Sequence, residues 1–117
     1  MDFKAEISGN TLIAEIGGEL DDHVAKSIKE KLDFALMKKE VSNAIFDLTG
    51  LSFMDSAGIG LLIGRYKQIH ARKGKTIVVA GSAQVKRILK MSGVLNIFIE
   101  AETMADALEM VGLPSIA

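Results

Sequence analysis

Residues 51–68 read LSFMDSAGIGLLIGRYKQ, and the interpretation of the whole chain starts from this stretch. An Asp-Ser pair is followed by three glycines, Gly58, Gly60 and Gly64, in a segment whose apolar residues have helical spacing. A glycine in a helix interior costs roughly 0.5–1 kcal/mol relative to alanine. That cost at three positions after a serine indicates either close packing or a surface that must stay open.

The segments on either side alternate between strands and helices. Polar and apolar residues alternate over residues 3–7 and 12–16, and Gly9-Asn10 lies between them, which predicts an antiparallel hairpin. Three further strands are predicted at residues 43–50, 76–81 and 95–100. Because helices separate these strands, we expect them to pair in parallel. The predicted fold class is therefore α/β, with a mixed β-sheet of an antiparallel N-terminal hairpin and parallel remaining strands.

Four helices are predicted in the remaining segments. The first is capped by Asp21 or Asp22, and its apolar residues follow helical spacing. The second follows a loop at residues 51–55 and covers about residues 56–72. The other two are expected at residues 82–93 and 103–112.

The composition limits the classes of function. The chain has 117 residues and is expected to form a single domain over residues 1–117. It has no cysteine, which excludes disulfides and thiol chemistry. Its 14 basic and 15 acidic residues give a net charge of -1, so nothing favours nucleic acid or an anionic membrane as a partner. No apolar run approaches the ~20 residues of a membrane span and no signal sequence is present, so we expect a cytoplasmic protein.

The catalytic motifs that the central stretch suggests are incomplete. Its glycines lack the spacing of a dinucleotide-binding loop, no P-loop lysine follows them, and Met54 stands where a hydrolase elbow requires glycine. Asp47 and Asp55 near one loop do not by themselves make a Mg²⁺ site. We therefore expect a binding protein with no catalytic residue, metal or cofactor. An enzyme that acts at the loop of Asp47, Asp55 and Ser56 is the alternative class.

Ser56 can be interpreted in two ways. Serine at a helix start is common as an N-cap, and this is the simpler interpretation. A phosphate on Ser56 would meet the free N–H groups and the partial positive charge of the helix N-terminus, which favour an anion. On this second interpretation Gly58 and Gly60 leave a surface open around Ser56. Gly64, deeper in the helix, is assigned to close packing against the sheet.

Three segments resemble a known family. GELDDHVA at residues 18–25, the central stretch as far as Ile69, and VKRILKMSGVLNIF at residues 85–98 are similar to the anti-sigma-factor antagonists of the STAS family. The similarity runs through nearly the whole chain, and the central stretch is its most specific part. It implies a STAS-type mixed β-sheet with four interspersed α-helices, which agrees with the order of elements predicted above.

The resemblance implies a regulator controlled by phosphorylation. Ser56, which follows Asp55 and precedes Ala57 and Gly58 in a D-S-x-G motif, is implied to be the phosphoacceptor. The unphosphorylated protein would bind an anti-sigma factor that is also an ATP-dependent serine protein kinase, and would so free a sigma factor. The kinase would inactivate the antagonist, and a metal-dependent serine phosphatase would restore it. The same fold in another partner-switching pathway, for general stress response or biofilm control, is the alternative.

The resemblance also implies which residues meet the partner. They are Asp21, Asp22, His23, Asp55, Ser56, Ala57, Gly58 and Gly60. Two positions depart from the family pattern, because Ala57 stands where relatives often have a second serine and Asp22-His23 stands where they tend to have two histidines. No nucleic acid or membrane partner is expected, and we expect a monomer or a weak dimer.

Overall fold

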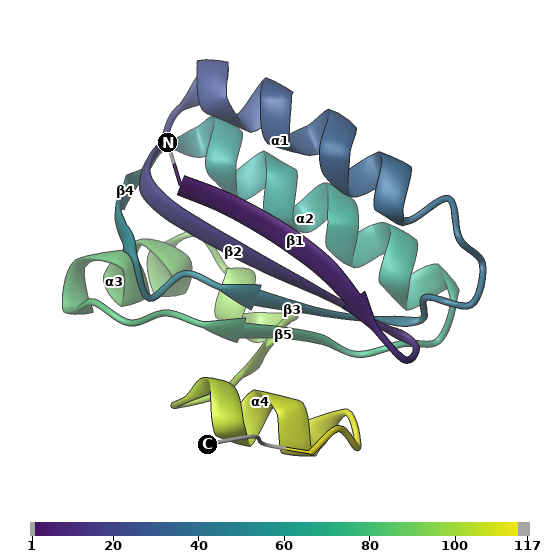
Figure 1. Ribbon diagram of the computed structural model, residues 1–117. Helices are drawn as coiled ribbons and strands as arrows, with labels where there is room; N and C mark the ends of the chain where they lie inside the picture. The colour runs from purple at the N-terminus through teal and green to yellow at the C-terminus, as the bar shows by residue number, and fades with distance from the viewer. Residues whose placement is uncertain (1, 115–117) are drawn as a thin grey trace.

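In the computed structural model, which describes residues 2–114, a mixed six-stranded sheet separates the last helix from the other three (Figure 1). The strands are β1 (Asp2–Ser8), β2 (Thr11–Leu20), β3 (Asn43–Asp47), β4 (Leu51–Met54), β5 (Thr76–Val79) and β6 (Ile99–Glu100). The helices are α1 (Asp22–Ala35), α2 (Ser56–Ala71), α3 (Ala83–Met91) and α4 (Met104–Met110), and a 3₁₀ turn covers Val94–Asn96.

The directions of the strands confirm the predicted mixed sheet. The strand order is β1-β2-β3-β5-β6, and β4 pairs with the far end of β2. β1 and β2 are antiparallel and are joined at Gly9-Asn10, whereas all other pairs are parallel. Parallel strands bring their carboxyl ends, and the residues that follow them, to one edge of a sheet. The segments that follow β2 and β4, which are α1 and α2, therefore begin at the same edge.

Residues 51–54 were predicted as part of a loop, and this prediction is wrong. They form β4, which pairs in parallel with the end of β2. Only Leu51 and Met54 are buried, while Ser52 and Phe53 are exposed. A strand of four residues with two exposed neighbours has neither strict alternation nor a continuous apolar run, so its sequence does not look like a strand.

The strand predicted over residues 95–100 is also largely wrong. The 3₁₀ turn takes its first part, and only the two-residue β6 remains. Val94 and Phe98 are both buried and lie four residues apart, which is the spacing of a helical turn. The Phe98 N–H donates a hydrogen bond to the Val94 carbonyl at 2.9 Å, so this backbone is used within the turn.

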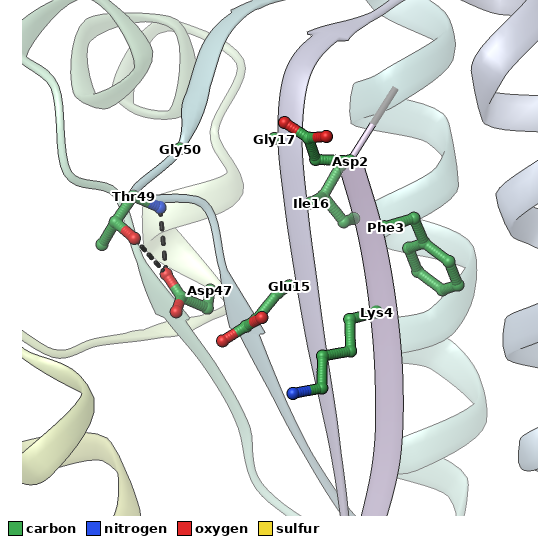
Figure 2. A pocket seen from close by; sticks show the side chains of 9 residues that line it. All are labelled: Asp2, Phe3, Lys4, Glu15, Ile16, Gly17, Asp47, Thr49 and Gly50. Carbon is green, nitrogen blue, oxygen red and sulfur yellow. Dashed lines mark hydrogen bonds between the residues drawn. The ribbon is translucent and has the colours of Figure 1, made fainter.

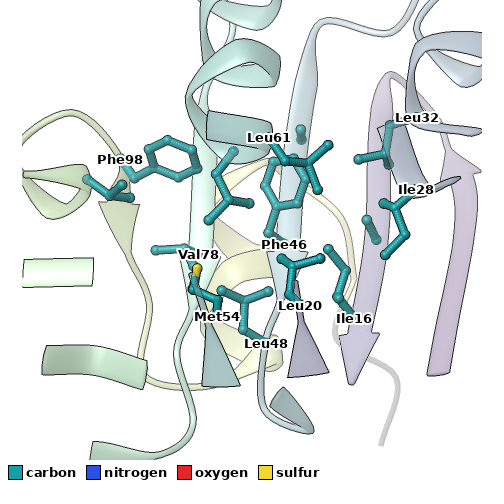
Figure 3. Packing of buried hydrophobic residues seen from close by; sticks show 14 of the residues in the cluster. Ile16, Leu20, Ile28, Leu32, Phe46, Leu48, Met54, Leu61, Val78 and Phe98 are labelled. Carbon is teal, nitrogen blue, oxygen red and sulfur yellow. The ribbon is translucent and has the colours of Figure 1, made fainter. Parts of the chain in front are cut away.

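The main hydrophobic core lies between the sheet and helices α1, α2 and α3 (Figure 3). Alternate residues of a strand face the same side, and Leu12, Ala14 and Ile16 of β2 all point into this core. A smaller cluster on the opposite face, under α4, contains Ile45, Ile77, Val79, Ala101 and Ala107. Full burial of one large apolar side chain contributes about 1.5–3 kcal/mol, so the larger core holds α1 and α2 firmly on the sheet.

Arg72, directly after α2, holds the end of α1 in place. Its guanidinium donates hydrogen bonds to the carbonyl oxygens of Lys38 at 3.2 Å, of Val41 at 2.7 Å and of Leu36. Leu36 is the C-cap residue of α1, where carbonyl groups lack partners within the helix. A side chain from the end of α2 therefore satisfies the end of α1 and ties the two helices together.

We predict that Arg72→Ala lowers the free energy of unfolding by about 2–3 kcal/mol, because three carbonyl groups lose a charged donor. Urea denaturation of the two proteins measures this difference. Lys67→Ala is the matched control, since Lys67 is exposed on the same helix, and its effect should stay within about 0.5 kcal/mol. Equal effects of the two substitutions would show that Arg72 does not hold α1.

Candidate functional site

The ends of β2 and β4 place two helix starts side by side. Leu20 and Met54, the last residues of these parallel strands, are partners in the ladder. The chain continues from each into an aspartate, Asp21 or Asp55, and then into α1 or α2. The Asp55 N–H donates to the Leu20 carbonyl at 3.3 Å. Both helices therefore present their N-terminal ends, which carry partial positive charge, at one edge of the molecule (Figure 1).

Both aspartates are N-caps. Oδ1 of Asp55 accepts hydrogen bonds from the N–H groups of Ala57 at 2.9 Å and Gly58 at 3.3 Å, and Asp21 caps α1 in a similar way. Because Asp55 caps α2, the interpretation of Ser56 as only an N-cap is wrong. Ser56 is the first residue of the helix and its side chain is exposed. Its hydroxyl is therefore not needed to hold the helix end.

The three glycines of α2 have different surroundings. A Cβ at Gly58 would lie 3.0 Å from side-chain carbons of Leu20 and 3.2 Å from the Leu20 carbonyl oxygen. A Cβ at Gly60 or Gly64 would meet no atom within 4 Å. The assignment of Gly64 to close packing is therefore wrong, and so is the assignment of Gly58 to an open surface. Gly58 lets α2 start against β2, whereas Gly60 is exposed and leaves space, as predicted.

The residues predicted to meet a partner gather around the two helix starts. Five of them are exposed, namely Asp21, Asp22, His23, Ser56 and Gly60. The other three are partly or fully buried, namely Asp55, Ala57 and Gly58. The fold makes one continuous edge of two segments that are more than thirty residues apart in the chain. Their role in binding a partner stays a prediction.

A groove of about 250 Å³ lies between α1 and α2. It is lined by Asp22, Ala25, Lys26 and Lys29 of α1 and by Ala57, Gly60, Leu61 and Arg65 of α2. Arg65 is only 6% exposed and was not among the residues predicted from the sequence. The signal was present, because Arg65 occupies an inward position of α2 between the buried residues Leu62 and Ile69, where helical spacing calls for an apolar side chain.

Asp33 of α1 compensates the buried charge of Arg65. Its Oδ1 lies 3.3 Å from the Arg65 Nε and accepts a hydrogen bond from the Gln68 amide at 3.0 Å, while Lys29 donates to Oδ2 at 3.1 Å. Partial burial raises the pKa of Asp33, but the hydrogen bonds from Gln68 and Lys29 and the charges of Arg65 and Lys29 outweigh burial and hold the pKa below its usual value. Asp33 is therefore ionised in the folded protein at neutral pH.

Asp47 lies in a different pocket, of about 490 Å³ (Figure 2). The pocket is lined by Asp2, Phe3, Lys4, Glu15, Ile16, Gly17, Asp47, Thr49 and Gly50. Oδ1 of Asp47 accepts hydrogen bonds from the Thr49 N–H at 3.0 Å and from its hydroxyl at 2.7 Å, which shapes the turn after β3. Neither Asp55 nor Ser56 lines this pocket. Asp47 therefore does not share this pocket with Asp55 or Ser56.

Comparison with known proteins assigns the family. The sequence profile of the STAS domain matches residues 2–109. The chain belongs to the STAS domain family. The resemblance found in the sequence is thereby confirmed, and the D-S-x-G segment at the start of α2 lies inside the matched region of this STAS domain.

Three similar proteins carry informative names. The "Anti-sigma F factor antagonist" of Lysinibacillus sphaericus is 36% identical over 94 residues, which cover 80% of each chain. The anti-sigma factor antagonist SpoIIAA in its unphosphorylated form superposes with a TM-score of 0.76 at 29% identity, covering 94% of this chain and 97% of that one. The Bacillus cell fate determinant SpoIIAA in the phosphorylated form gives 0.75 at 32% identity, covering 94% and 99%. These neighbours confirm the mixed sheet and helices of the predicted fold.

Two features are absent from residues 2–114 of this STAS domain. No group of three or more His, Cys, Asp and Glu side chains in this range could hold a metal ion. None of the helices in the described part of the chain combines the length and the apolar character needed to cross a membrane.

We predict opposite effects of alanine at two of the glycines. Gly58→Ala should lower the free energy of unfolding by about 1–3 kcal/mol, because the Leu20 side chain is fully buried and its backbone cannot move away from the new Cβ. Gly64→Ala should raise it by about 0.5–1 kcal/mol through helix propensity alone. Thermal melts of both variants test the assignment, and a loss of stability with Gly64→Ala would contradict it.

The Asp33 carboxylate predicts a pH dependence of stability. A carboxyl group with a lowered pKa in the folded state stabilises the fold above its unfolded pKa of about 3.9, and this contribution is lost as the pH falls through the folded pKa. Wild type should therefore be more stable than Asp33→Asn at pH 7, and the difference should shrink when urea denaturation is repeated below about pH 3.9. A difference that is independent of pH would exclude the ionised carboxylate as its cause.

Proposed function

We propose that this STAS domain is an anti-sigma factor antagonist that is switched by phosphorylation of Ser56. In the unphosphorylated state it binds an anti-sigma factor through the edge formed by the starts of α1 and α2, and a sigma factor is released. The observation that carries the proposal is the exposed hydroxyl of Ser56 at the first position of α2, next to an aspartate that already caps the helix. Modification of this hydroxyl leaves the structural hydrogen bonds of the helix start intact.

The proposed partner is also a serine protein kinase. It transfers the γ-phosphoryl group of ATP to the Ser56 oxygen, the hydroxyl loses its proton, and ADP leaves. A metal-dependent serine phosphatase hydrolyses the phosphoserine and restores the active antagonist. In this cycle the antagonist is a substrate and a regulator rather than an enzyme, and the exchange takes place in the cytoplasm. The names of the SpoIIAA neighbours, one phosphorylated and one unphosphorylated, support such a cycle.

The phosphate acts on the binding edge and not on the fold. A dianion at a helix N-terminus is favoured by roughly 0.3–1 kcal/mol through the helix dipole. The carboxylates of Asp55 and of the neighbouring Asp21 and Asp22 oppose it by repulsion. These contributions have opposite signs and similar size, so the stability of the domain changes little. A partner surface that closes over Ser56, in contrast, meets about 1.5 to 2 new negative charges and three additional oxygens.

We predict that the anti-sigma factor kinase of the same organism, with ATP, adds one phosphate to Ser56, located by mass spectrometry. The Ser56→Ala variant should bind the kinase and resist phosphorylation, and Ser56→Asp should bind at least tenfold more weakly than Ser56→Ala because of its charge. Ser52→Ala is the matched control, since Ser52 is exposed nearby and donates its hydroxyl to the Gly18 carbonyl at 3.1 Å.

A phosphate on Ser52, or normal phosphorylation of Ser56→Ala, would contradict the assignment of the acceptor. The thermal stability of the phosphorylated protein gives a separate check of the mechanism. A large drop in melting temperature together with loss of binding would show that phosphorylation unfolds the domain.

A further inference from the structure

Arg65 is a buried cation with unused hydrogen-bonding capacity. Its side chain is 7% exposed, and its one salt-bridge partner within residues 2–114 is Asp33, whose Oδ1 lies 3.3 Å from the Arg65 Nε. Its Nε and Nη1 atoms are buried and have no hydrogen-bond partner among the described residues. A guanidinium has five N–H donors and is costly to bury without acceptors. This side chain lines the groove between α1 and α2, so its positive charge acts on an occupant, while its Nε and Nη1 atoms are themselves closed to solvent.

The walls of the groove add to this positive charge. Lys26 and Lys29 line it together with Arg65, and Asp22 adds a carboxylate. Asp33, which pairs with Arg65 and with Lys29 beside the groove, adds a second carboxylate, so the three cations exceed these two anions by one positive charge. Lys26 pairs with Asp22 only at 3.7 Å, with both side chains more than 70% exposed, so an occupant can compete for that lysine. The charge of the groove is complementary to an anionic group.

The shape of the groove leaves room for such a group. Ala25, Ala57 and Gly60 are the small residues of its lining, and a Cβ at Gly60 would meet no atom within 4 Å. The volume of about 250 Å³ is enough for an acidic side chain. The groove is also continuous with the edge around Ser56, since Ala57 directly follows the proposed phosphoacceptor. A protein that covers Ser56 therefore also covers the mouth of the groove.

We propose that the groove between α1 and α2 receives an aspartate or glutamate side chain of the anti-sigma factor, held by Lys26, Lys29 and Arg65. The planar guanidinium fork and the two ammonium groups match a carboxylate. The proposal rests on the proposed function and identifies the chemistry of the partner at the same site. Because Ala57, the residue after Ser56, lines the groove, a phosphate on Ser56 adds negative charge at its mouth. It reduces the attraction of the groove for the partner's carboxylate, which adds to the clash over Ser56 itself.

Isothermal titration calorimetry without ATP measures how tightly two charge-reversal variants bind the anti-sigma factor. The anti-sigma factor used is the one that phosphorylates Ser56. Lys26→Glu should weaken binding at least tenfold. Lys31→Glu is the matched control on the same helix, because Lys31 lies over the Phe3 ring and away from the groove, and it should change the affinity less than threefold. Equal effects of the two reversals would overturn the proposal.

Two variants of Gly60 separate charge from volume. Gly60→Glu places a carboxylate at the groove, and Gly60→Gln places a side chain of the same size without charge. Binding should be at least fivefold weaker for Gly60→Glu than for Gly60→Gln, whereas equal affinities would show that the groove only requires space. In a complementary experiment, each acidic residue on the partner's contact surface is replaced by lysine, one at a time. One of these partner variants should restore the affinity for the Lys26→Glu protein. Failure of every substitution to do so would overturn the proposal.

Titration of wild type with inorganic phosphate, followed by NMR at the Arg65 Nε–H, tests a free anion as the occupant. Little change below 1 mM phosphate is expected. Saturation below that concentration would overturn the assignment to a partner's side chain. If wild type binds no anti-sigma factor, the proposed function itself fails. If wild type binds and Lys26→Glu binds equally well, only the groove proposal fails.

Discussion

The parallel pairing of the end of β2 with β4 is the interaction on which the candidate site depends. It sets Leu20 beside Met54, and so places Asp21 beside Asp55 and the first turn of α1 beside the first turn of α2. The approach is close enough that a Cβ at Gly58 would press on Leu20. Without this register the two helix starts, the exposed Ser56 and the groove above Arg65 would not share one edge.

This arrangement explains how a small domain can be switched without a change of fold. The helix starts are capped by aspartates whose hydrogen bonds do not involve the Ser56 hydroxyl. The core behind them includes buried side chains from α1, α2 and the sheet (Figure 3). Arg72 ties the far end of α1 to α2. A rigid edge with an accessible hydroxyl can gain and lose a charged group while its backbone stays in place. The proposed regulation is therefore a change of surface charge and shape.

Much of the fold followed from the sequence because it rests on local signals. The Gly9-Asn10 turn, the alternating strands and the cap residues Asp21, Ser82 and Thr103 act over a few neighbouring residues. The features that escaped prediction depend on contacts between distant segments. β4 is defined by its partner β2, and the packing of Gly58 is set by Leu20. Helical spacing places Arg65 on the inner face of α2, but its pairing with Asp33 of α1 is not visible from spacing along one helix. The position of Ser56 could be predicted, but its freedom from capping could not.

The central claim is that the starts of α1 and α2 form one binding edge. Amide hydrogen exchange of the protein, alone and bound to the unphosphorylated-state partner, tests this claim most directly. We predict that residues 19–29 and 53–61 gain protection together, whereas α4 and the strands beneath it keep their exchange rates. Protection of α4, or of only one of the two helix starts, would contradict it.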